Sequence, residues 1–171
     1  STQRNISQEL CGGPKAMKVL FALEDYIIDP LGIAYLSSYL KLYGHEVGLV
    51  NFDAEDVYDK LSQFRPDVLA YSLTTGRHVK FKRLNLKLRG YAQAGLGYTP
   101  FSLFGGPHCT FYPQFVHEAG VDAICQGEGF VGFAELLTRL HPHKPIRDIP
   151  NIRTKAQPVG DMAPIVDKNA I

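Results

Sequence analysis

Closely spaced cysteines are missing from this sequence of 171 residues. Its three cysteines, Cys11, Cys109 and Cys125, are odd in number and widely separated, and they form no CxxC or CxxxCxxC motif. A disulfide framework and a zinc or iron–sulfur site are therefore excluded, because both need paired or clustered cysteines. Any metal would have to arrive inside a cofactor.

Long hydrophobic runs and an excess of charge of one sign are also missing. No apolar run approaches the roughly 20 residues that a bilayer span needs, and residues 1–5 lack the charged-then-apolar order of a signal peptide. We therefore expect a soluble, cytoplasmic protein. The 18 Lys and Arg against 17 Asp and Glu, a net charge of +1, give no argument for nucleic acid or a membrane as a partner. With 45% hydrophobic residues, the chain can bury the core of one domain.

Short apolar segments alternate with amphipathic ones along the chain. Continuous apolar runs predict strands at 18–23, 47–52, 68–74, 101–104 and 123–125. This repeated β-α order predicts a flavodoxin-like or Rossmann-like α/β fold: a doubly wound, five-stranded parallel sheet in the order 2-1-3-4-5, flanked by helices. In such folds ligands bind outside the carboxyl ends of the strands.

Capping residues and helical spacing predict the helices between these strands. Asp29 suits the N-cap of the first helix and Pro30 its first turn, and Asp53 suits the cap of the second. Further helices are expected at 77–94 and through Phe133–Leu140. In the first helix, the residues at the spacing of an apolar face are Leu31, Ala34, Tyr35, Ser38 and Leu42.

The predicted core is bounded by two segments with little periodicity. Residues 1–16, which include Gly12-Gly13-Pro14, are expected to be a flexible leader. Residues 17–153 are expected to form the domain, and residues 154–171 a linker or tail.

Four loops should line the carboxyl edge of the sheet, at 24–29, 75–78, 105–112 and 127–130. Gly105-Gly106 would let the backbone approach a bulky ligand, although glycines are also common in ordinary β-α turns. Ser72 and Thr74 alternate along their strand, so both hydroxyls should point to one face, where a polar ligand group could bond them. Glu128, between Gly127 and Gly129, suits either a helix cap or a ligand contact.

Several of these segments resemble the cobalamin-binding domain of radical-SAM proteins. They are Pro30-Leu31-Gly32-Ile33-Ala34-Tyr35-Leu36, Ser72-Leu73-Thr74, Gly105-Gly106-Pro107-His108-Cys109-Thr110 and Gly127-Glu128-Gly129. The resemblance implies that the corrin rests on the strand-end loops while the nucleotide tail passes beside the glycine pair. The residues that it implies for cofactor contact are Tyr26, Ile27, Ser72, Thr74, Thr75, Arg77, His78, Gly105, Gly106, Pro107, His108, Thr110, Gly127, Glu128 and Gly129.

The sequence departs from the family pattern after its first strand. The family signature DxHxxG supplies a histidine to cobalt there, whereas residues 24–32 contain no histidine. The resemblance therefore implies that cobalamin binds base-off and His-off, and an open lower face changes the redox potential and the ease of methyl transfer. His108 is expected to shape its loop or bond the corrin rim, and Cys109 to pack as a small buried hydrophobe.

The cysteines that would hold a radical-SAM 4Fe–4S cluster are also absent from the chain. The resemblance implies that S-adenosylmethionine and the cluster belong to an adjoining domain, with residues 149–152 at the junction. Cobalamin and that domain are then the expected partners, and the chain by itself is expected to bind rather than to catalyse.

Two other hypotheses stay open at this point. A receiver-like domain would need an Asp at the end of the third strand, where Ser72-Leu73-Thr74 stands, and an FMN-binding domain would need a hydroxyl-rich phosphate loop after the first strand. A degenerate pocket would leave a scaffold or interaction domain without a cofactor.

Overall fold

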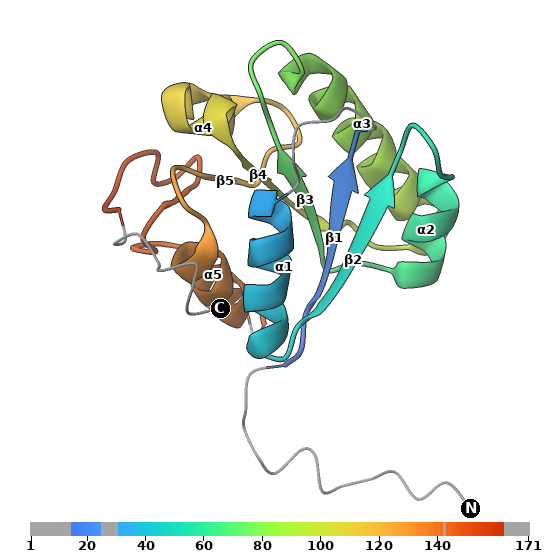
Figure 1. The fold of residues 1–171 in the computed structure, drawn as a ribbon, viewed down its shortest axis with the longest axis horizontal. Coiled ribbons are helices and arrows are strands. Elements are labelled where there is room, and N and C mark those ends of the chain that lie inside the picture. Colours follow the sequence, from blue (N-terminus) through green and yellow to red (C-terminus); the bar gives the residue numbers. More distant parts are fainter. Residues whose placement is uncertain (1–14, 25–30, 142, 163–171) are drawn as a thin grey trace, which may run out of the picture.

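A computed structural model describes residues 15–24, 31–141 and 143–162. One sheet in the order β2-β1-β3-β4-β5-β6 lies between two layers of helices (Figure 1). Its strands are β1 (Lys18–Leu23), β2 (Glu46–Asn51), β3 (Val68–Ser72), β4 (Phe101–Gly105), β5 (Ala123–Cys125) and β6 (Ile152–Arg153). The predicted α/β fold is confirmed.

The expected count of five strands is wrong, because β6 pairs antiparallel with β5 through Ile124↔Arg153 and Cys125↔Ile152. The other four strand pairs are parallel. Two residues are too few to show a period of two in the sequence. Both are nonetheless buried, with 4% of Ile152 and 2% of Arg153 exposed.

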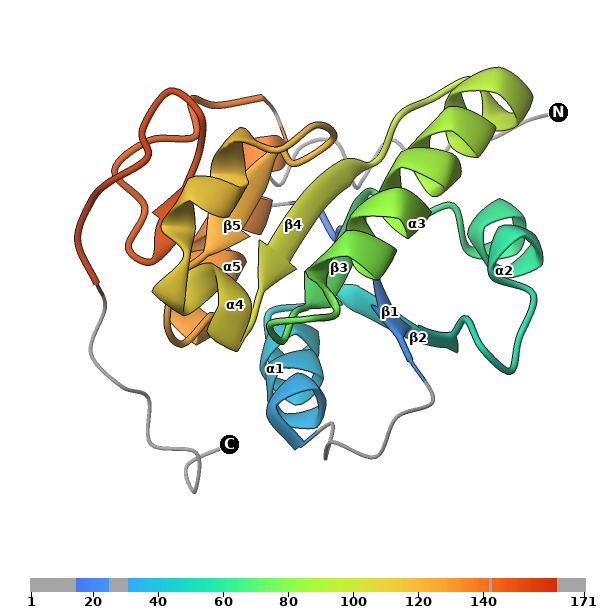
Figure 2. The ribbon, with the colours of Figure 1, turned by 90° about the horizontal axis from the view of Figure 1, so that it is seen from above.

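The helices are α1 (Leu31–Leu42), α2 (Val57–Phe64), α3 (His78–Tyr91), α4 (Pro107–Phe111) and α5 (Phe130–Leu140). A π-helical turn, η2 (Ala92–Leu96), extends α3, and a 3-10 turn, η3 (Pro113–His117), follows α4. Figure 2 shows α1 and α3 on opposite sides of the strands. No helix in the described part of the chain is both long enough and apolar enough to span a membrane.

Two expectations about helix ends and faces are corrected. Asp56, not Asp53, caps α2: its Oδ1 accepts from the backbone N–H groups of Tyr58 (3.0 Å) and Asp59 (3.1 Å). Glu55 N–H donates to the Asn51 carbonyl in a turn, so the helix is capped three residues later than expected. Asp29 and Pro30 lie outside the described residues.

The inner face of α1 also differs from the expected one. Leu42 is 71% exposed, whereas Leu40 and Ser37 are buried and Ile33 and Leu36 pack against the core. The helix carries apolar residues in two rows, so its periodicity alone did not identify the row that packs against the sheet.

The pleat of the central strands divides the core into two clusters, one on each face of the sheet. Leu20, Leu69 and Tyr71 belong to the cluster beneath α2 and α3, and Phe21 and Ala70 belong to the cluster beneath α1 and α5. The parallel register places Phe21 beside Ala70, Ala70 beside Leu103, and Leu103 beside Ala123. A row of small and large apolar side chains therefore crosses the sheet under α1 and α5.

A buried polar network that no sequence pattern indicates joins α3 to the sheet. Asn85 is fully buried, and its Oδ1 accepts from Tyr71 Oη (3.1 Å) and Ser102 Oγ (2.6 Å). Its Nδ2 donates to the Gly120 carbonyl at 2.8 Å. Arg89, one turn along α3, donates to Asp122 and to Ser102 Oγ. The network fixes α3 against β3, β4 and the turn before β5.

The segment that follows β6 lies against it as far as Met162. Asn151 N–H donates to the Asp161 carbonyl (2.9 Å), and the Arg153 guanidinium donates to the Gly160 carbonyl (2.7 Å) and to Gln126 Oε1 (3.2 Å). Arg153 thereby connects this segment to the residue before Gly127.

The Asn85→Ala variant should lose about 3 kcal/mol of unfolding free energy, because the hydroxyls of Tyr71 and Ser102 and the Gly120 carbonyl would each lose a buried partner. Urea unfolding followed by circular dichroism measures the change. Lys87→Ala, an exposed position on the same helix, should change stability by less than about 0.5 kcal/mol. Equal losses in the two variants would contradict the structural role of the network.

Candidate functional site

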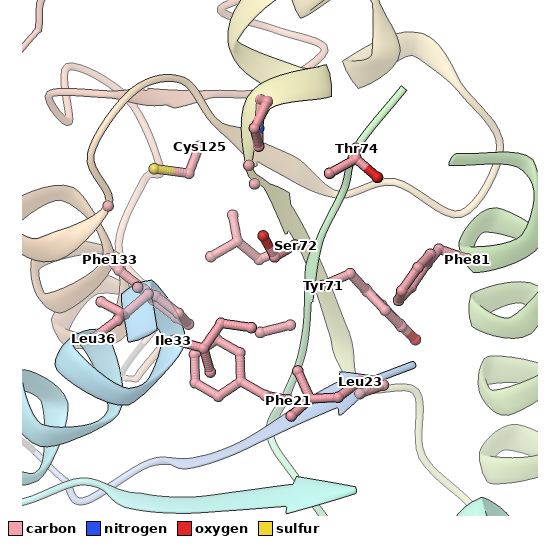
Figure 3. A pocket seen from close by; sticks show the side chains of 18 of the residues that line it. Phe21, Leu23, Ile33, Leu36, Tyr71, Ser72, Thr74, Phe81, Cys125 and Phe133 are labelled. Carbon is pink, nitrogen blue, oxygen red and sulfur yellow. The ribbon is translucent and has the colours of Figure 1, made fainter. Parts of the chain in front are cut away.

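A cavity of about 950 Å³ opens at the carboxyl ends of the strands and extends between the sheet and helices α1 and α5 (Figure 3). Its volume is typical of small-molecule and cofactor sites. The carboxyl edge is where the predicted fold places a ligand. The cavity is therefore the candidate site.

One end of this cavity is lined by hydrocarbon. The side chains of this apolar end come from three strands and two helices; they are Phe21, Ala70, Leu103, Ile33, Leu36, Phe130 and Phe133. Figure 3 shows Phe21, Ile33, Leu36 and Phe133 gathered on one side of the hollow. Phe21 and Phe133 pack edge to face with ring centroids 6.0 Å apart. Cys125 adds a thiol to the same wall, and burial raises its pKa to about 12, so it stays neutral.

The mouth of the cavity, by contrast, carries polar side chains. This polar rim consists of Glu24, Asn51, Ser72, Thr74, Arg77 and Glu128, all at or just beyond strand ends. Glu24 accepts from Arg77 at 2.8 Å and also from Lys80, which reaches Asp53 at 3.2 Å. These ion pairs join the loops after β1 and β2 to the start of α3. The rim offers both hydroxyl groups and charges to a ligand.

Gly105 and Gly106 have different roles, although the sequence suggested a shared one. A Cβ on Gly105 would meet Cys125 Cβ at 3.6 Å, which is ordinary contact beside the cavity. A Cβ on Gly106 would lie 2.7 Å from the backbone N and O of Leu73, and its φ of +89° already favours glycine. Gly106 is therefore required by the backbone, whereas Gly105 leaves space in the site.

Thr75, His78 and His108 lie together on the side of the sheet covered by α3 and α4. The two imidazole rings stack at 4.2 Å between centroids with 4° between their planes. His108 Nδ1 is 3.2 Å from Thr75 Oγ1. Burial lowers the pKa of His108, and a charge on His78 lowers it further. A neutral His108 thus shapes the loop after Gly106, and none of these three residues is on the cavity wall.

Thr110 connects two of the motifs. Its Oγ1 accepts from the Gly127 N–H at 3.0 Å, and its own N–H donates to the Gly106 carbonyl at 3.1 Å. Gly127 has a φ of +79°, and Glu128 follows it on the cavity wall, one residue before Gly129, the N-cap of α5. Thr110 therefore holds the loop before α5 against the loop after β4.

Nine of the fifteen residues expected to contact a cofactor line the cavity. They are Ser72, Thr74, Arg77, Gly105, Gly106, Pro107, Gly127, Glu128 and Gly129. Thr75, His78, His108 and Thr110 lie behind the wall, and Tyr26 and Ile27 lie outside the described residues. The expectation missed the apolar end, for which the sequence offers one signal: Ile33 and Leu36 are three residues apart on the helix that follows the first loop.

The Gly106→Ala variant should lose at least about 2 kcal/mol of stability, because its Cβ meets backbone atoms that cannot move independently and its φ is strained. Gly105→Ala should lose less than about 1 kcal/mol, since ordinary contacts surround its Cβ. Urea unfolding of both variants makes the comparison. Similar losses at the two positions would show that Gly106 does not carry the backbone contact described above.

The B12 binding domain family matches residues 17–137. Curated relatives include an uncharacterized methyltransferase of Pyrococcus horikoshii, 28% identical over 131 residues, and the hopanoid C-3 methylase of Methylococcus capsulatus, 26% identical over 133 residues. These alignments cover 70% and 73% of this chain but 26% and 25% of the relatives. The chain thus spans about a quarter of the length of each.

Solved structures with the same fold include two enzymes determined with cobalamin. One is the radical S-adenosylmethionine methyltransferase TsrM from Kitasatospora setae with cobalamin and a 4Fe–4S cluster bound, at a TM-score of 0.68 and 16% identity over 90% of this chain and 30% of that one. Another is the cobalamin-dependent S-adenosylmethionine radical enzyme OxsB with aqua-cobalamin bound, at a TM-score of 0.68 and 20% identity over 89% of this chain and 23% of that one. With the family match covering most of its length, this chain belongs to the B12-binding domain family.

Proposed function

We propose that this domain binds cobalamin base-off and His-off at the carboxyl edge of its sheet, with the nucleotide tail in the cavity and the corrin over the strand-end loops. The observation that carries the proposal is the cavity, which is apolar at one end, polar at its rim and bordered by Gly105. Core side chains would fill this space in a scaffold that had lost its ligand. Here a cavity of about 950 Å³ remains between the strand ends and the first turns of α1 and α5.

The residues present fit the two parts of the cofactor. The flat aromatic base of the tail suits the apolar end, where aliphatic and aromatic side chains surround it. Its ribose and phosphate suit the rim, where Ser72, Thr74 and Arg77 offer donors. Gly105 would leave room for the tail between these two zones. Bound cobalamin supplies a cobalt centre that can carry a methyl group.

The positions of the histidines support the His-off part of the proposal. No histidine belongs to the cavity lining in the described part of the chain, and the sequence at 25–30 contains none. His78 and His108 stack on one another, and His108 bonds Thr75. These positions support the proposal that no imidazole from this domain binds cobalt and that its lower face stays open.

We place the domain as the N-terminal module of a cobalamin-dependent radical-SAM enzyme that carries out methyl transfer or related radical chemistry. The support is the length of the relatives, about four times that of the matched segment, and the S-adenosylmethionine and 4Fe–4S cluster named with the structural neighbours. In this proposal an adjoining domain holds S-adenosylmethionine and the cluster. The domain described here contributes the cobalamin.

Hydroxocobalamin incubated with the purified chain should remain bound after desalting, and its absorption spectrum should be that of a base-off corrinoid without an imidazole ligand. Electron paramagnetic resonance of the reduced cob(II)alamin form reports the same point, because an axial nitrogen splits its signals. A chain that desalts colourless would overturn the proposal. Nitrogen splitting in a coloured complex would overturn its His-off and base-off part.

The Gly105→Val variant should weaken cobalamin binding by at least about tenfold, because two methyl groups would occupy space beside the cavity that the tail needs. Gly90→Val is the matched control, since its Cβ meets nothing within 4 Å and it lies on α3, away from the cavity. Titration by absorbance gives both affinities, and circular dichroism checks the fold. Unchanged affinity in a folded Gly105→Val protein would refute the placement of the tail.

A further inference from the structure

We infer that the apolar end of the cavity selects among cobamides by their lower base, favouring a benzimidazole base over a purine base. A cobamide is a corrinoid with a nucleotide tail, and natural cobamides differ in the base at the end of that tail. The inference rests on the proposed function and adds to it the chemical class of the preferred cofactor. It follows from how hydrogen-bonding groups are distributed over the cavity wall.

The side chains at the apolar end offer a ligand almost no hydrogen bonds. Phe21, Ala70 and Leu103 form a continuous row across β1, β3 and β4, and each is at most 3% exposed. Phe130 and Phe133 close the row from α5, and both are at most 4% exposed. Aromatic rings and aliphatic groups complement a flat hydrocarbon surface.

The strand backbone behind Phe21, Ala70 and Leu103 offers no free groups either. Phe21, Ala70 and Leu103 lie in the middle of the parallel ladder, so strand pairing already uses the N–H and C=O groups around them. Ser72, the polar side chain next along β3 on the same face, is at the rim, two residues beyond Ala70.

Cys125 is the one heteroatom-bearing side chain at the apolar end, within the part of the chain that the structure describes. A thiol is a weak donor and a weak acceptor. Burial raises its pKa to about 12, so it does not ionise to become a stronger acceptor. A Cβ built on Gly129 would lie 3.2 Å from its sulfur, so the thiol is already close to the loop before α5.

The two kinds of lower base differ where they would meet this wall. Both contain an imidazole ring, but the second ring carries two methyl groups in 5,6-dimethylbenzimidazole and an amine with two ring nitrogens in adenine. Methyl groups gain from burial against phenylalanine and leucine. The amine and ring nitrogens would lose hydrogen bonds to water without replacement. The adenine cobamide should therefore bind at least about tenfold more weakly.

The experiment compares three corrinoids on the same purified chain: hydroxocobalamin, its adenine counterpart, and cobinamide, which has no nucleotide. Absorbance titration gives each dissociation constant. We expect hydroxocobalamin to bind most tightly, with the adenine cobamide and cobinamide at least about tenfold weaker. An adenine cobamide as tight as hydroxocobalamin, with cobinamide still weak, overturns base selection but leaves the tail in the cavity. Equal binding of all three overturns the tail placement as well, and binding of none overturns the proposed function itself.

The two bases also differ in how easily they leave cobalt, and this difference does not depend on the protein. A pair of variants separates it from selection by the protein. Leu36 is partly buried and faces the cavity from α1. Leu36→Gln adds a flexible amide that can bond adenine, and Leu36→Met keeps a similar apolar volume. The intrinsic ease of base release is the same in both proteins, so it cancels when their affinity ratios are compared. The ratio of the dissociation constant of the adenine cobamide to that of hydroxocobalamin should be at least about threefold smaller in Leu36→Gln than in Leu36→Met. An unchanged ratio of these two dissociation constants in a folded Leu36→Gln protein overturns the inference.

Discussion

The close contact between the backbones of Gly106 and Leu73 fixes the carboxyl edge on which the rest of the site depends. Leu73 N–H donates to the Gly105 carbonyl at 2.8 Å, and the Leu73 carbonyl accepts from His108 N–H at 3.0 Å. Gly106 lies between these two bonds and has no Cβ to collide with Leu73, so β4 can turn directly into α4. The turn carries His108 to one side of the sheet, where it stacks on His78, and leaves Gly105 facing the cavity on the other. Thr110 extends the same constraint to Gly127 through one hydrogen bond.

A buried polar network lies on the face of the sheet opposite the cavity, among the apolar side chains beneath α3. On the α3 side, Asn85 and Arg89 bond β3, β4 and the turn before β5 in a buried network. These bonds hold β3 and β4 in place from the face opposite the cavity. A wall held rigidly from one face can keep a preformed apolar site on the other, and a preformed site reduces the ordering cost of binding.

Sequence patterns predicted the elements that repeat and the turns that need special residues. The buried strands appeared as continuous apolar runs, and the glycine motifs marked the strand ends that form the cavity mouth. Patterns failed where a choice depends on three-dimensional contacts. Asp53 and Asp56 both suit an N-cap, and the turn at Asn51 selects the second. Two residues of β6 are too short to show alternation, and Asn85 occupies a helix position that local sequence cannot distinguish from a solvated one.

Family motifs identify this domain better than they describe its cavity, because they mark turns that need particular residues rather than positions that need only an apolar side chain. Gly106, His108 and Thr110 belong to the most distinctive motif, yet Gly106 and Thr110 contact backbone atoms and His108 stacks on His78. Such constraints are exacting, because only particular residues satisfy them, so they leave a recognisable pattern in the sequence. The apolar end requires only hydrophobic side chains of suitable volume, which resemble any other core positions. Selectivity for the base of the tail would therefore lie outside the glycine motifs, and homologous domains can change it without losing those motifs.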